Sequence, residues 1–136
     1  MKIVLDEGAV LPRREHPHDA GLDLFAKNNA VIRPGGYAQF DTGVHVEIPV
    51  GYVGMVTSKS GLMRDGITSR GTIDAGYTGS IHVILFNHGS KRVIIKKGQK
   101  ISQLVLMRII TPNLEVVDSL EETERGNNGF GSTGQF

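Results

Sequence analysis

Hydrophobic and polar residues alternate in short runs along most of the chain, and glycine or proline interrupts the runs roughly every ten residues. No window of about a dozen residues keeps the period of about 3.6 residues that an amphipathic helix shows. Short strands at even spacing are typical of a β-barrel or jelly roll. The pattern therefore predicts an all-β domain of that kind, with strands at 2–5, 19–26, 37–40, 44–48, 51–57, 92–95 and 100–110.

Two stretches interrupt the strand pattern. The segment 58–66 is expected to hold one short helix, entered through Ser60 and Gly61. The loop 12–18 contains His16 and His18, which raises the possibility of a metal site. Because the chain has no cysteine and no second ligand pair at matching spacing, we interpret this segment as a solvated loop.

One carboxylate and one phenol lie between glycines in the stretch 71–79, Gly-Thr-Ile-Asp-Ala-Gly-Tyr-Thr-Gly. Apolar residues flank Asp74, and an apolar run follows at 81–86. These features predict a hairpin with its turn near Ala75 and Gly76. A carboxylate there would lie at the edge of the core, where it can be held in one orientation and act as a general base. The alternative is an aspartate that only hydrogen-bonds its own turn.

Three further polar groups are candidates for ligand contact. Alternation along 19–26 places Asp23 on the face opposite the leucines. Lys59 and Ser60 precede the expected helix, where a lysine, a hydroxyl and backbone amides form an anion cradle, although Ser-Gly is also an ordinary helix cap. Gln103 is polar among aliphatic neighbours, and it is either an outward-facing strand residue or a ligand contact.

The chain turns polar after Pro112 and ends in a glycine-rich segment. Its composition suits a loose arm that orders over a ligand, with Arg125 and backbone amides meeting phosphates and Phe130 stacking on a base. A disordered terminus without function is the alternative.

Composition limits the possible partners. The chain has 136 residues, 15 Lys plus Arg and 14 Asp plus Glu, which fits one domain whose net charge gives no reason to expect nucleic acid or a membrane surface as partner. The absence of cysteine fits a reducing compartment. Charged residues appear too early for a signal peptide, and no apolar run reaches membrane-spanning length, so we expect a soluble, cytoplasmic protein.

Five stretches, in this order and spacing, resemble the trimeric dUTP pyrophosphatases, or dUTPases. The resemblance implies a distorted jelly-roll barrel at 1–120 with a mobile C-terminal arm at 121–136. It also implies a homotrimer with three shared active sites and Mg²⁺-dependent hydrolysis of dUTP to dUMP and pyrophosphate, which keeps uracil out of DNA and supplies dUMP for thymidylate synthesis. The stretches are Ala20-Gly-Leu-Asp-Leu24, Lys59-Ser-Gly-Leu62, Gly71-Thr-Ile-Asp-Ala-Gly-Tyr-Thr-Gly79, Gly98-Gln-Lys-Ile-Ser-Gln-Leu104 and Arg125-Gly-Asn-Asn-Gly-Phe-Gly-Ser-Thr-Gly134.

The same resemblance implies a role for each matching residue. Asp74 would activate the water that attacks the α-phosphorus, and Tyr77 would lie under the deoxyribose and leave no space for a 2′-hydroxyl. Asp23 would reach Mg²⁺ through water, with the metal mainly on the triphosphate. Uracil recognition falls to backbone groups of Gly71, Thr72, Ile73 and the region of His82. Triphosphate binding falls to Lys59, Ser60, Gly61 and Gln103, with Arg125, Phe130, Gly131, Ser132 and Thr133 of the arm closing over the nucleotide.

Two positions depart from the family pattern. Lys59 stands where the family usually has arginine, which replaces a bidentate fork by a point charge, and Gly76 replaces a common acidic residue. Three other interpretations remain open: a deoxycytidine nucleotide deaminase, which needs a glutamate base that 71–79 lacks; a module that binds a regulatory protein; and a purely structural barrel. The last does not explain five spaced motifs.

Overall fold

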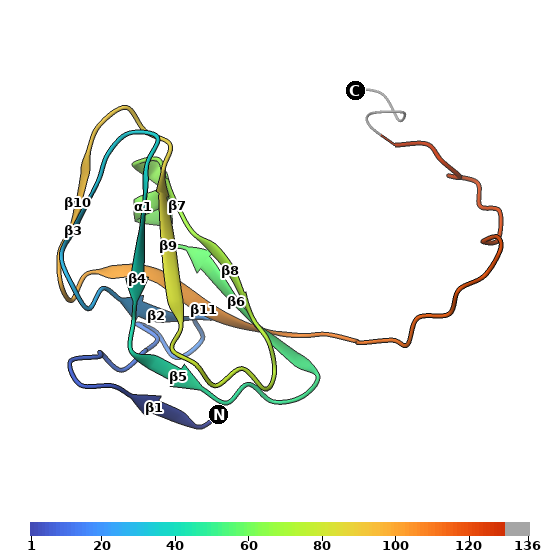
Figure 1. The fold of residues 1–136 in the computed structure, drawn as a ribbon, viewed down its shortest axis with the longest axis horizontal. Helices are drawn as coiled ribbons and strands as arrows, with labels where there is room; N and C mark the ends of the chain where they lie inside the picture. The colour runs from blue at the N-terminus through green and yellow to red at the C-terminus, as the bar shows by residue number, and fades with distance from the viewer. Residues whose placement is uncertain (130–136) are drawn as a thin grey trace.

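The computed structural model describes residues 1–129. Short antiparallel strands and one helix, α1 (Ser60–Arg64), form the body of the protein up to Arg108 (Figure 1). The strands are β1 (Ile3–Leu5), β2 (Gly21–Phe25), β3 (Ala30–Ile32), β4 (Tyr37–Asp41), β5 (Val44–Val46), β6 (Tyr52–Ser58), β7 (Ile67–Thr68), β8 (Arg70–Ile73), β9 (His82–Asn87), β10 (Val93–Ile95) and β11 (Lys100–Arg108).

Two main sheets enclose one core. A four-stranded sheet has the order β2-β11-β6-β8, and a three-stranded sheet has the order β4-β9-β7. Two ribbons, β1-β5 and β10-β3, complete the body. The predicted all-β, jelly-roll-like architecture is confirmed. The buried aliphatic side chains that fill it include Leu24, Ile32, Val56, Ile67, Ile81, Val83, Leu85, Ile95, Ile101 and Leu104.

The prediction of a hairpin at 71–79 is wrong in its pairing. The turn itself is present, since the Tyr77 N–H donates to the Asp74 carbonyl at 3.1 Å and Gly76 has a φ of 91°. However, β8 pairs with β6, whereas β9 pairs with β4 and β7. Ile73 and Ile81 are both buried, so the chain crosses from one sheet to the other between them instead of folding back within one sheet.

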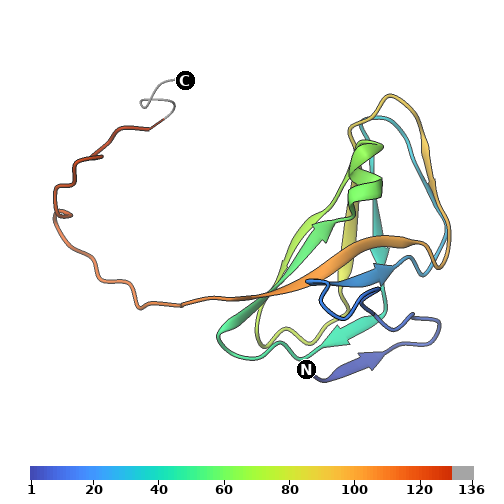
Figure 2. The ribbon, with the colours of Figure 1, turned by 180° about the vertical axis from the view of Figure 1, so that it is seen from behind.

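The other expected elements are present and differ from expectation only at their ends, but β3 and β7 were not predicted. The short helix predicted within 58–66 is α1, preceded by Lys59 at its N-cap. The last strand ends at Arg108, and residues 109–129 leave the barrel without helix or strand (Figures 1 and 2). In the part of the chain that the structure describes, no helix is long and apolar enough to cross a membrane.

Candidate active site

Asp23 is a buried carboxylate held between two lysines. Asp23 lies on β2, and 3% of the residue's surface is exposed. Lys59 Nζ contacts Oδ1 at 2.5 Å, and Lys100 Nζ contacts Oδ2 at 2.8 Å. Burial raises the pKa of Asp23, but the hydrogen bonds from Lys100 and Lys59 outweigh it and hold the pKa below its ordinary value. Asp23 is therefore an anion that two ammonium groups hold in place.

Lys100 is a member of this cluster that sequence reasoning missed. It also contacts Glu15 Oε2 at 2.7 Å, so it joins the loop before β2 to the cluster. The pairing of β11 with β2 shifts between Lys100 and Ser102, and this bulge brings Lys100 to the side of Asp23 although strict alternation would not. Ile101 and Ser102 are both buried, as a bulge allows, but in the sequence an isoleucine followed by a serine looks like ordinary alternation and gives no signal.

Gln103 lies in the same cluster, directly opposite Asp23 on one side and Thr57 on the other. Its side chain covers Gly21: a Cβ built on Gly21 would lie 2.3 Å from Gln103 Oε1. Gln103 Nε2 also reaches the carbonyl oxygen of Ser58 at 3.4 Å, at the end of β6. The lack of a side chain at Gly21 is thus what allows Gln103 its present position.

Ser60 and Gly61 form the first turn of α1, beside this cluster, and both are exposed. The structure therefore brings together the residues expected to bind triphosphate, namely Lys59, Ser60, Gly61 and Gln103. It places Asp23, expected to reach Mg²⁺ through water, among them and adds Lys100.

A second group of site residues follows β8. Gly71, Thr72 and Ile73 pair with β6 on one side, and β8 is the last strand of its sheet, so backbone groups on its other side are available to a flat hydrogen-bonding ligand. Asp74 follows directly and is exposed rather than held at the edge of the core. Within residues 1–129 no hydrogen bond reaches its carboxylate. Neither the expected place at the edge of the core nor the alternative, an aspartate that bonds its own turn, is seen.

Tyr77 is fixed against the backbone of its own turn. Its hydroxyl donates to the Ser80 carbonyl at 3.0 Å, and a Cβ built on Gly79 would lie 2.4 Å from Tyr77 Oη and 2.6 Å from Cζ. The ring therefore lies where only glycine at position 79 leaves room. The Ser80 hydroxyl in turn donates to Asp41, and this bond, with one from the Gly43 N–H, lowers the pKa of the Asp41 carboxyl.

His82 begins β9 and is exposed. Its Nδ1 accepts a hydrogen bond from the Gln39 amide at 2.9 Å, so Nε2 carries the ring proton and can donate it.

The two groups of site residues lie at different ends of the four-stranded sheet. Asp23, Gln103, Thr57 and Arg70 form one row across β2, β11, β6 and β8. Asp74 follows Arg70 by four residues, which is about 13 Å along a strand. Figures 1 and 2 show α1 at one end of the barrel, and β5, which the 74–80 turn contacts, at the other. One chain thus does not place Asp74 beside the lysine cluster.

The arm residues are only partly described. Arg125 is exposed, and its Nε donates to the Asn128 carbonyl at 3.1 Å. The predicted sites Phe130, Gly131, Ser132 and Thr133 lie outside the described residues.

The donor set bears on the implied Mg²⁺. Within residues 1–129, no group of three or more acidic, histidine or cysteine side chains is placed to hold a metal ion. Asp23 offers one ionised carboxylate, whose oxygens already accept from two lysines. These residues fit a hard cation carried mainly by substrate oxygens and reached by one carboxylate through water.

Comparison with known proteins identifies the family. The sequence profile of the dUTPase family matches residues 7–134. The deoxyuridine 5'-triphosphate nucleotidohydrolase of Clostridium tetani is 44% identical over 97% of this chain and 94% of its own. The Staphylococcus bacteriophage 80alpha dUTPase with dUPNHPP has a TM-score of 0.91 at 34% identity, covering 98% of this chain and 97% of its own. A variant dUTPase from phage phi11 of S. aureus, described with a structural Mg(II) ion, has a TM-score of 0.81 at 31% identity, covering 89% of this chain and 98% of its own. The chain belongs to the dUTPase family.

Proposed function

We propose that this chain hydrolyses dUTP to dUMP and pyrophosphate and so acts as a dUTP diphosphatase. Family membership supports the reaction. The observation that carries it is the continuous run from the open edge of β8 into Asp74 and Tyr77, because it joins a base-pairing edge, a carboxylate and a ring in one short segment.

Asp74 is the proposed general base. Its carboxylate is exposed and has no hydrogen-bonded side-chain partner within residues 1–129, so it can accept a proton from water. The water oxygen forms a bond to the α-phosphorus, the bond from that phosphorus to the bridging oxygen breaks, and pyrophosphate leaves with the electron pair. A positioned base of this kind typically contributes roughly 10² to 10⁴ in rate.

The edge of β8 is proposed to select the base and the sugar. Backbone groups of Gly71, Thr72 and Ile73, with the region of His82, would pair with uracil as a strand pairs with its neighbour. Cytosine has its donors and acceptors reversed, and a buried unpaired polar group costs about 1 to 3 kcal/mol. Tyr77, seated over Gly79, would lie under the deoxyribose and exclude a 2′-hydroxyl.

The lysine cluster is proposed to bind the triphosphate. Lys59, Ser60, Gly61 and Gln103 would contact phosphate oxygens, and Asp23 would reach Mg²⁺ through water. Bound Mg²⁺ would neutralise charge on the triphosphate. Because both Asp23 oxygens accept from lysines, Asp23 also holds the Lys59 ammonium in place.

We further propose that the active sites are shared within a homotrimer. The separation of about 13 Å along β8 between Asp74 and the row of Asp23 supports this, because a triphosphate anchored at Lys59 in one copy would need Asp74 of another. The arm, residues 121–136 beyond a barrel of residues 1–120, would close over the nucleotide with Arg125, Phe130, Gly131, Ser132 and Thr133. This division of the chain stays a prediction.

The cellular consequences follow from the chemistry. Removing dUTP keeps uracil out of DNA, and the dUMP formed feeds thymidylate synthesis. The cytoplasmic location and a regulatory protein partner stay predictions. The deaminase alternative is weakened because β8 and the turn that follows it contain no glutamate.

The test is pyrophosphate release with Mg²⁺ from dUTP, UTP, dCTP and dTTP, with Asp74→Asn as control. We expect release from dUTP alone and its loss in the control, while the control still binds a non-hydrolysable dUTP analogue. Full activity of Asp74→Asn would refute the assignment of the base, and ammonia release from dCTP would revive the deaminase.

A further inference from the structure

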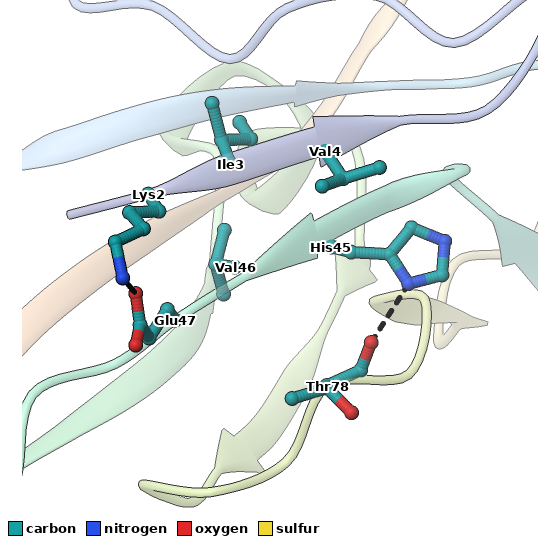
Figure 3. Close-up of a pocket in the computed structure, with 7 residues that line it drawn as sticks. All are labelled: Lys2, Ile3, Val4, His45, Val46, Glu47 and Thr78. Atoms are coloured by element: carbon teal, nitrogen blue, oxygen red, sulfur yellow. Dashed lines mark hydrogen bonds and ion pairs between the residues drawn. The ribbon is translucent and has the colours of Figure 1, made fainter.

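The 74–80 turn has a contact on its underside that the proposed reaction does not use. His45, in the middle of β5, points towards this turn, and its Nδ1 lies 2.8 Å from the Thr78 carbonyl oxygen (Figure 3). Its Nε2 lies 3.2 Å from Asp6 Oδ1, just beyond the end of β1. One imidazole therefore joins the β1-β5 ribbon to the turn that carries Asp74 and Tyr77.

Both partners of His45 can only accept hydrogen bonds. A backbone carbonyl has no proton to give, and an ionised carboxylate has none either. A neutral imidazole has one N–H and one lone pair, so it can satisfy only one of the two contacts. The imidazolium form donates from both nitrogens. The geometry around His45 is therefore complete only when the ring is protonated.

The other histidines of the body do not share this property. His88 Nε2 lies 2.9 Å from the Thr68 hydroxyl, which can donate as well as accept, so a neutral ring is satisfied. His82 Nδ1 accepts from the Gln39 amide and therefore carries no proton. Among residues 1–129, His45 is the one histidine with an acceptor within hydrogen-bonding distance of each ring nitrogen.

The charges around His45 favour its protonation. Asp6 lies in direct contact with it, and Asp41 adds a second negative charge nearby. Lys2 and Glu47 line the same pocket and form an ion pair at 2.9 Å, so their charges nearly cancel at His45. The Lys27 ammonium lies beside Gly43 and offsets part of the negative charge of Asp41. The bond to the Thr78 carbonyl, followed by that to Asp6, raises the pKa of His45 above its ordinary value.

We propose that protonated His45 is a positioning residue: by tying the Thr78 carbonyl to Asp6 it fixes the turn that presents Asp74 and Tyr77 to the nucleotide. This proposal rests on the proposed dUTP hydrolysis. Thr78 directly follows Tyr77, so a movement of the Thr78 carbonyl also shifts the backbone that carries the Tyr77 ring. When His45 loses its proton, one ring nitrogen faces an acceptor with a lone pair, one of the two links breaks, and the turn loses its anchor on β5.

The first experiment follows the turn without substrate. In the full chain, NMR titration of the histidine rings and of the Gly79 and Ser80 amides is compared between wild type and Asp6→Asn. We expect both ring nitrogens of His45 to be protonated at about pH 6, His45 to titrate above the ordinary imidazole value, and the two amides to shift in step with His45. In Asp6→Asn, His45 should titrate at lower pH. The proposal would be overturned if His45 were neutral at about pH 6, or if the chemical shifts of the two amides did not change as His45 titrates.

The second experiment measures kcat/KM for dUTP against pH in wild type, His45→Gln and the matched control His88→Gln. Loss of one hydrogen bond corresponds to about a fivefold loss of kcat/KM for His45→Gln at low pH. The ratio of wild type to His45→Gln should fall towards one as pH rises through the titration of His45, and His88→Gln should match wild type throughout. A ratio that stays constant with pH would show a merely structural role and refute the proposal. Absence of hydrolysis in every protein would refute the proposed function instead, while the NMR result still decides whether His45 anchors the turn.

Discussion

Replacing Lys100 by methionine tests how the buried carboxylate of Asp23 is held. Methionine keeps an unbranched stem of similar length and removes the charge. Removing one partner of a fully buried ion pair costs about 3 to 5 kcal/mol, because the remaining charge has no compensation. In this cluster Lys59 still contacts the other oxygen, and the Lys100 side chain is 34% exposed. We therefore expect Lys100→Met to lower the free energy of unfolding by about 1 to 3 kcal/mol.

The chain offers a matched control in Lys2→Met. Lys2 contacts Glu47 at 2.9 Å, nearly the distance from Lys100 to Asp23, but the two side chains are 86% and 58% exposed. Exposed pairs contribute about 0 to 1 kcal/mol. The two substitutions therefore differ in the burial of the carboxylate that each leaves behind. Lys100→Met also removes the contact to Glu15, whose side chain is 58% exposed, and an exposed pair of this kind contributes as little as the Lys2 pair.

The assay is thermal unfolding at neutral pH and one protein concentration, because oligomer stability depends on concentration. A loss of 1 kcal/mol lowers Tm by about 3 to 4 °C for a domain of this size, so we expect about 3 to 12 °C for Lys100→Met and under about 4 °C for Lys2→Met. The pKa of Asp23 is lowered in the folded state, so its stabilisation is present above the ordinary aspartate pKa and is lost as pH falls through the folded value. The gap between the two variants should shrink over that range. Equal losses for both variants, or a gap that persists in acid, would refute the reasoning.

The remaining predictions concern how the site is built. Gly79→Ala should displace the Tyr77 ring and lower kcat/KM for dUTP about fivefold, through loss of the hydroxyl contact. It should also reduce the preference for dUTP over UTP. An unchanged preference would show that the Tyr77 ring does not select the sugar. Gly21→Ala should expel the Gln103 side chain and raise KM more than it lowers kcat, and a crystal structure with Gln103 in place would contradict this. Lys59→Arg should lower KM by about two- to fivefold, because a fork binds phosphate oxygens in pairs; a higher KM would show that the pairing with Asp23 requires lysine.

Alternation along the chain was enough to predict the longer strands and to place Asp23 opposite the leucines, because one face of each strand must enter the core. It missed β3 and β7, which are too short to show a period. Alternation could not predict which strands pair. The segment 71–79 has the local features of a hairpin, yet burial of Ile73 and Ile81 in one core makes the chain cross between sheets. Local sequence does not encode that choice, since it depends on where β6 and β4 lie.

For a similar reason, some residues of the site could be predicted from the sequence and others could not. Lys59, Gln103 and Asp23 belong to recognisable stretches, and the structure places them together. Lys100 lies within one of those stretches but reaches Asp23 only because β11 has a bulge, which breaks the alternation on which its placement would be judged. The His45 contact joins residues 33 positions apart and has no local signal at all.

The most direct test of the central claim is complementation between two impaired variants, assayed at a dUTP concentration far below KM. Asp74→Asn lacks the base, and Gln103→Ala lacks a triphosphate contact in the other group of site residues. If each site takes Asp74 from one copy and Gln103 from another, trimers formed at random from an equal mixture should recover about a quarter of wild-type dUTP hydrolysis. If all the groups acted within one chain, every site would carry one lesion. Mixed trimers as inactive as either parent would contradict the shared site.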